Sequence, residues 1–158
     1  MKRYFPFALV CALLFTASCG APDLLDYQRY PIFADCLLSY DEGNLPDVRF
    51  SCEIADRDSA RLIFTDGELA GFAVTVTRAG VSLTDGQGFT VPLECTGSAP
   101  VRAVVSAFAL DPEKVESAPE SSEIRTVDGS VTVVLGNGIP KKLIFDGFTV
   151  TVTGFSNK

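Results

Sequence analysis

The alternation of apolar and polar residues along short runs constrains this fold more than any other feature of the chain. Phe72, Val74 and Val76 occupy alternate positions, with Thr75 and Thr77 between and after the valines, and "TVTVTG" repeats the pattern at residues 149–154. Successive side chains on a β-strand point to opposite faces, so each run predicts a strand with one apolar and one polar face. Turn pairs that favour positive φ separate the runs at Asp66-Gly67, Ala79-Gly80, Asp128-Gly129, Asn137-Gly138 and Asp146-Gly147. The pattern predicts an antiparallel meander of about nine to eleven strands.

Residues 33–54 predict a long hairpin centred on Asn44. In this register the facing pairs are Tyr40 with Val48, Leu38 with Phe50, Cys36 with Cys52, and Ala34 with Ile54. All of these side chains then share one face, and a slip of one residue would invert a strand. With Cys36 directly opposite Cys52, two alternatives stay open. The pair forms a disulfide in an oxidising compartment, or it remains two buried thiols.

One segment has the spacing of a core-facing helix. In "GSAPVRAVVSAFAL" (residues 97–110), Ser98 is placed to cap the helix and Pro100 suits its first turn. Val101, Val104, Val105 and Phe108 follow at helical spacing. A shorter helical turn is predicted before Pro31. Together these elements predict a mainly β (α+β) fold. We expect an antiparallel, strongly curved sheet with one amphipathic helix and a short N-terminal helix packed on its concave face.

The N-terminal segment has the three parts of a secretory signal. Lys2 and Arg3 precede an apolar run from Tyr4 to Phe15, and small residues then lead to Cys19. "TASC" resembles the lipobox of bacterial lipoproteins, in which the cysteine receives a diacylglycerol, and the resemblance makes Cys19 the lipid attachment site. The alternative is ordinary cleavage, for example after Ala21, which would discard Cys19.

The lipoprotein interpretation divides the chain into three parts. Residues 1–18 are a signal peptide, residues 19–23 are the lipidated cysteine with a short tether, and residues 24–158 form one β-rich domain. This interpretation places the protein outside the cytoplasm. There the lipid would anchor it to the bacterial cell membrane, or to the outer membrane of a Gram-negative cell.

The charge and the composition exclude several functions. Residues 19–158 hold eleven basic and twenty acidic residues, which argues against binding nucleic acid or docking electrostatically onto anionic lipid. Membrane contact would therefore rest on the anchor. The chain has no histidine, which excludes Ser-His-Asp and Cys-His catalysis and histidine-ligated metal sites. We expect a protein that is not an enzyme, with no cofactor and no metal site.

Two further groups of residues have a structural explanation. Asp56, Asp58 and Asp66 carry ligand chemistry that suits calcium, but no "DxDxDG" loop is present and such acids usually mark solvated turns. Cys95 has no basic neighbour in sequence to lower the pKa of its thiol, so a buried, inert thiol is expected.

Three segments resemble the LolA/LolB superfamily of lipoprotein carriers. These are "YPIFADCLLSY", "RLIFTDGELAGFAVTVT" and "VTVVLGNGIPKKLIFDGFTVTVTGF". The resemblance implies an unclosed β-barrel whose helices plug an apolar cavity that binds acyl chains. Candidate lining residues are Phe50, Phe72, Val104 and Phe108; the alternative is that they belong to a filled core. The expected function is a non-enzymatic lipoprotein that binds a lipid or another apolar ligand. The alternative is a structural or interaction lipoprotein that acts through a surface patch.

Overall fold

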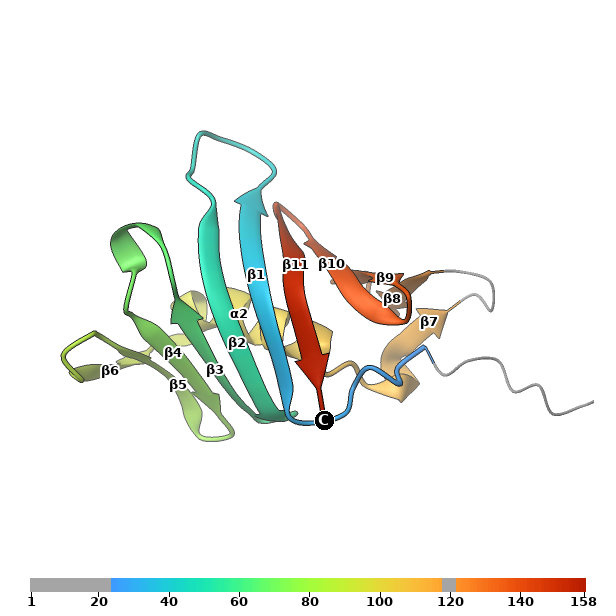
Figure 1. Ribbon diagram of the computed structural model, residues 1–158, viewed down its shortest axis with the longest axis horizontal. Helices are drawn as coiled ribbons and strands as arrows, with labels where there is room; N and C mark the ends of the chain where they lie inside the picture. The colour runs from blue at the N-terminus through green and yellow to red at the C-terminus, as the bar shows by residue number, and fades with distance from the viewer. Residues whose placement is uncertain (1–23, 118–121) are drawn as a thin grey trace, which may run out of the picture.

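The computed structural model describes residues 24–117 and 122–158, which form one antiparallel sheet with a helix on one side (Figure 1). The strands are β1 (Ile32–Tyr40), β2 (Val48–Asp56), β3 (Ser59–Phe64), β4 (Ala73–Thr77), β5 (Gly80–Thr84), β6 (Thr90–Leu93), β7 (Val115–Ser117), β8 (Glu123–Thr126), β9 (Thr132–Gly136), β10 (Ile139–Phe145) and β11 (Phe148–Asn157). The helix is α2 (Cys95–Phe108), and two short 3-10 segments are η1 (Gly67–Leu69) and η2 (Pro112–Lys114).

The strand order makes the first and last strands of the sheet neighbours in its middle. The order is β6-β5-β4-β3-β2-β1-β11-β10-β9-β8-β7, so β1 pairs with β11, the last strand. The two edge strands, β6 and β7, pair with one neighbour each and leave the sheet open. The expected fold class, an unclosed and mainly β arrangement with one helix, is confirmed. Pro92 lies in the edge strand β6, where its missing N–H is tolerated.

The β1–β2 register differs from the predicted one by two residues. Cys36 faces Phe50, and Cys52 faces Ala34, so the predicted pairing of Cys36 with Cys52 is wrong. A shift of two positions leaves every side chain on its own face, and the apolar pattern therefore cannot distinguish the two registers. The observed register places Ile32 opposite Ile54, and both side chains are fully buried.

The helix α2 begins earlier than predicted. It starts at Cys95 with Glu94 at the N-cap position, and the Glu94 side chain makes no capping hydrogen bond. Ser98 lies inside the helix rather than at its cap, since its backbone N–H donates to the Glu94 carbonyl at 3.0 Å. Pro100 therefore lies inside the helix rather than in its first turn, and its missing N–H costs one intrahelical hydrogen bond.

The segment before β1 is a turn, not the short helix that the sequence predicts. Residues 24–27 form the turn, and the Gln28 N–H donates to the Leu25 carbonyl at 2.9 Å. A segment this short forms too few hydrogen bonds to offset the free-energy cost of nucleating a helix. It is held instead by Tyr27, whose hydroxyl donates to the Ala107 carbonyl at 3.4 Å. The Tyr27 ring also makes an edge contact with Phe155.

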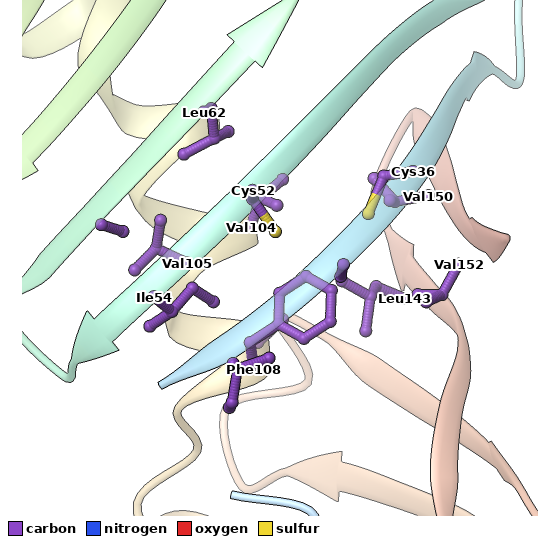
Figure 2. Close-up of a cluster of buried hydrophobic side chains, with 14 of the residues drawn as sticks. Cys36, Cys52, Ile54, Leu62, Val104, Val105, Phe108, Leu143, Val150 and Val152 are labelled. Atoms are coloured by element: carbon purple, nitrogen blue, oxygen red, sulfur yellow. The ribbon is translucent and has the colours of Figure 1, made fainter. Parts of the chain in front are cut away.

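The core lies between the concave face of the sheet and α2. Figure 2 shows Val104, Val105 and Phe108 of the helix facing Ile54 and Leu143 of the sheet. These side chains belong to one continuous buried cluster, in which Phe108, Ile54 and Leu143 have no exposed surface. Packing of this kind makes the helix and the sheet a single unit.

Candidate functional site

The structure places most of the predicted cavity-lining residues in the packed core. Phe50 and Val104 are 3% exposed and Phe108 is 0% exposed. A side chain that lined an empty cavity wide enough for an acyl chain would keep accessible surface on the cavity side. Phe72 is half-buried and lies just before β4, where its carbonyl accepts from the Phe64 N–H at 2.9 Å. The structure does not bring these four residues together around one open space.

A band of half-buried apolar side chains lies on the same face, closer to the loop ends of the strands. We call it the open strip, and it consists of Leu38, Val48, Phe64, Leu83 and Phe148. Leu38 faces Val48 across β1 and β2, and Phe64 faces the buried Phe50. Leu83 lies farther along the sheet, on β5, opposite Val74. Phe148 stacks on Phe145 with ring centroids 4.6 Å apart.

The position of the helix explains why the open strip is only half covered. In Figure 1, α2 crosses behind the middle and lower part of the central strands. The upper ends of β1 and β2 extend beyond it toward their connecting loop. A concave apolar surface left partly uncovered in this way can take up an apolar chain or an apolar side chain of a partner.

A groove of about 350 Å³ lies on the outer face of the sheet, away from α2. Its lining includes Phe33, Asp35, Ser51, Ile63 and Gly154. The Ser51 hydroxyl donates to the Asp35 carboxylate at 2.7 Å. A Cβ at Gly154 would come 2.9 Å from the same carboxylate, so the glycine keeps this end of the groove open. The groove combines apolar walls with two carboxylates, Asp35 and Glu53, and with Arg61.

Cys36 and Cys52 are buried free thiols. They belong to neighbouring strands and are offset diagonally by the register, and Figure 2 shows both among the core side chains. A hydrogen bond to Cys52, together with burial, raises the pKa of the Cys36 thiol. A thiol held protonated in this way is a poor nucleophile. The side chain of Cys95 lies outside the described part of the structure.

The three aspartates with calcium-compatible chemistry are engaged elsewhere. Asp58 pairs with Arg78, and Asp56 accepts from the Asp58 N–H at 2.8 Å. Asp66 caps η1 by accepting from the Gly67 N–H at 2.7 Å, at the opposite end of β3. Among residues 24–117 and 122–158, no group of three or more candidate ligands could hold a metal ion.

The predicted signal peptide, Cys19, the predicted tether and the alternative cleavage site near Ala21 lie outside the described residues. Within the part of the chain that is described, no helix has the length and hydropathy needed to span a membrane.

The fold defines a class: a single, open, antiparallel sheet whose concave face is partly covered by one helix. No family model and no curated protein matches the chain. Two solved structures are similar to it over 87% of its length, each with a TM-score of 0.48. One is an uncharacterized conserved protein from Thermus thermophilus, 14% identical and covered over 85% of its own chain. The other is the LolA superfamily protein NE2245 from Nitrosomonas europaea, 10% identical and covered over 93%. Similarity at this level identifies no ligand.

The sequence did not predict the open strip or the outer groove, and the reason differs between the two. Leu38 and Val48 are expected on the apolar face from the hairpin pattern, but alternation does not tell how far a helix covers that face. Gly154 interrupts the last Val/Thr run, and a glycine inside a strand is a recognised signal of a bulge or an open surface.

Proposed function

We propose that this protein is a membrane-anchored extracytoplasmic lipoprotein, without enzymatic activity, that binds a lipid or another apolar ligand on the open strip. The observation that carries the proposal is the half-buried state of Leu38, Val48, Phe64, Leu83 and Phe148 on a concave face whose centre is packed. Transferring apolar surface out of water is favourable, so such a surface gains by being covered. The ligand would lie beside the core rather than inside an enclosed cavity.

The absence of histidine supports a binding role rather than catalysis. Acid–base chemistry near neutral pH relies most often on histidine or on a carboxyl group with a shifted pKa. Asp128 is a carboxyl whose pKa the fold changes. Hydrogen bonds from Ser130 and Thr126 lower its pKa to about 2. That direction suits a turn acceptor and not a general base or acid near neutrality.

Native mass spectrometry of residues 20–158 tests the ligand. These residues contain every strand and helix of the described fold. We expect a mass excess that matches a lipid and disappears on denaturation. Val48→Thr combined with Leu83→Thr should abolish the excess, because both changes place a hydroxyl on the open strip. The matched control is Ile63→Thr with Ile144→Thr on the outer face, which should retain it. Retention by both variants would exclude the open strip as the site.

The anchor has a separate test. Full-length protein expressed in bacteria with a labelled fatty acid should carry the label. Cys19→Ala should abolish the labelling, because the thioether acceptor is gone, and Cys11→Ala should not. An unlabelled wild-type chain that is released in soluble form would instead support ordinary signal cleavage.

A second candidate function is that of an interaction lipoprotein with a filled core. Two observations favour it: the tight packing around Phe108, and the outer groove beside Phe33 and Ile63. This function predicts an unliganded mass even after incubation with mixed lipids. The same spectra therefore decide between the two candidates.

A further inference from the structure

Several loops meet along one end of the sheet, and we call them the rim: residues 41–47, 65–72, 85–89 and 146–147. Antiparallel neighbours connect at alternate ends, so the β1–β2, β3–β4 and β5–β6 loops share one end. The β10–β11 turn lies at that end too, because Tyr40 faces Phe148 across β1 and β11. In Figure 1, the loops at 41–47 and 65–72 project beyond the strands.

Contacts between neighbouring loops make the rim continuous. The Asp41 N–H donates to the Gly147 carbonyl at 3.1 Å. The Thr65 N–H donates to the Arg49 carbonyl at 3.0 Å, which ties the 65–72 loop to the base of the 41–47 loop. Gly86 lies against Gly71, since a Cβ at Gly86 would come 3.9 Å from the Gly71 carbonyl oxygen. The four loops therefore present one surface.

The rim exposes large apolar side chains. Phe89 is 69% exposed, Leu45 60% and Leu69 42%. Each lies in a different loop of the rim. On the outer face of the sheet, by comparison, Phe33, Ile63 and Ile144 are 37–39% exposed. Apolar side chains gathered at loop tips, with polar residues around them, are typical of surfaces that bind a partner.

The charge of the rim indicates which partner it fits. Its four loops carry seven carboxylates and no lysine or arginine. The carboxylates are Asp41, Glu42, Asp47, Asp66, Glu68, Asp85 and Asp146. Such a surface repels anionic lipid and attracts basic groups.

The rim also lies at the far end of the sheet from the tether. The described chain begins at the other end, where the Asn157 side chain donates to the Tyr27 carbonyl at 2.8 Å. The five residues of the tether, 19–23, reach at most about 17 Å, whereas the nine residues of β1 extend about 30 Å. An anchor at Cys19, which is part of the proposed function, would thus leave the rim facing away from its own membrane.

We infer that the rim is a docking surface for a basic protein partner with exposed apolar side chains. Leu45, Leu69 and Phe89 provide the apolar contacts, and the carboxylates around them select the charge. The anchor affects only the orientation of the rim. Docking itself needs neither the lipid on Cys19 nor a ligand on the open strip.

The test uses residues 20–158 and an amphipathic 18-residue leucine–lysine peptide as the probe. Binding is measured by titration, and NMR amide shifts map the contact. We expect the shifts to concentrate in the four rim loops. Leu45→Ser, Leu69→Ser and Phe89→Ser together should weaken binding at least about tenfold, because central apolar contacts carry most interface energy. The matched triple variant Phe33→Ser, Ile63→Ser and Ile144→Ser should change it less than about twofold.

A second set of variants tests charge without altering shape. Glu42→Gln, Asp47→Asn and Glu68→Gln together should weaken the peptide several-fold and flatten its salt dependence. Glu53→Gln, Glu113→Gln and Glu116→Gln, all away from the rim, should have little effect. The open-strip variant Val48→Thr with Leu83→Thr should keep peptide affinity while losing lipid, so failure of the proposed ligand site and failure of the rim are distinguishable.

A vesicle-binding experiment tests whether the rim binds a membrane instead of a protein. Residues 20–158 should not bind phosphatidylcholine vesicles, with or without phosphatidylglycerol. Vesicle binding that the rim triple variant abolishes would overturn the inference in favour of a membrane-docking surface. Peptide shifts on the outer face, or equal losses in the rim and control variants, would overturn it outright.

Discussion

The register between β1 and β2 determines whether Cys36 and Cys52 can form a disulfide. Directly facing residues in a sheet bring their Cβ atoms within disulfide range, but diagonal partners are about 7–8 Å apart. The observed register makes the two cysteines diagonal partners. Their thiols are free and buried, and the contact between them raises the pKa of Cys36.

We therefore predict that Cys36 and Cys52 stay reduced and unreactive in the folded protein. Residues 20–158 carrying Cys95→Ser, purified without reductant, should gain no alkyl groups from a brief exposure to iodoacetamide. The same protein in urea should gain two. Intact-mass spectrometry measures both. A native mass two hydrogens lower, with no alkylation in urea, would show a disulfide instead.

The sequence predicted on which face of the sheet these residues lie, but not which residue lies opposite each of them on the neighbouring strand. Cys36, Phe50 and Cys52 all lie on the apolar face, as the period of two requires. Their partners depended on where the 41–47 loop turns, and Gly43, with φ at +89°, lies one residue before the predicted centre at Asn44. Apolar alternation carries no information about a shift of two positions.

The helix α2 is held to the sheet mainly by a few large side chains. Phe108 is fully buried at its C-terminal end, and Figure 2 shows it beside Leu143 of the sheet. The predicted spacing of Val104, Val105 and Phe108 was therefore confirmed. The start of the helix was not predicted, because Ser98 and Pro100 form a plausible N-terminus that competes with the true one at Cys95.

We predict that Phe108→Ala lowers the free energy of unfolding by about 3–5 kcal/mol, the usual cost of emptying a buried phenylalanine site. Phe89→Ala is the matched control, since Phe89 is 69% exposed, and should change it by less than about 0.5 kcal/mol. Urea unfolding followed by circular dichroism measures both. Equal effects would contradict the packing described around α2.

The turn before β1 gives the fold a dependence on alkaline pH. Burial raises the pKa of the Tyr27 hydroxyl to about 12, above its ordinary value of 10.0. The folded state thus holds this proton more tightly than the unfolded state. The resulting stabilisation is complete below pH 10 and is lost as the pH rises toward 12.

Tyr27→Phe should accordingly flatten the loss of stability between about pH 10 and pH 12. Urea unfolding at several pH values in this range tests the prediction. Tyr40→Phe serves as the control because Tyr40 is 41% exposed, and it should follow the wild-type curve. A Tyr27→Phe curve as steep as wild type would mean that other groups cause the alkaline loss.

The whole sheet depends on the pairing of its first and last strands. β11 lies between β1 and β10, so it joins the β1–β6 half of the sheet to the β7–β10 half. The sequence predicted the strands and several of their turns, but not this order. Pairing between distant strands leaves no local signal, since each strand satisfies the same period of two whatever its neighbour.

Removing residues 148–158 should therefore prevent folding, although β11 is only one strand of the sheet. The truncated chain would expose the long inner edges of β1 and β10 together with much of the core face. We expect it to show no cooperative urea transition and to aggregate. The matched control, Thr153→Ala within β11, keeps the strand and should unfold cooperatively. A cooperative transition in the truncated chain would mean that each half of the sheet is stable alone.

The central position of β11 also determines when the sheet can be completed during synthesis of the chain. β11 is made after every other strand of the sheet, so the β1–β6 half and the β7–β10 half cannot be joined before it has been synthesised. Until then β1 offers an unpaired edge to every other chain nearby. A nascent chain of this kind gains from being held unfolded until β11 has been made.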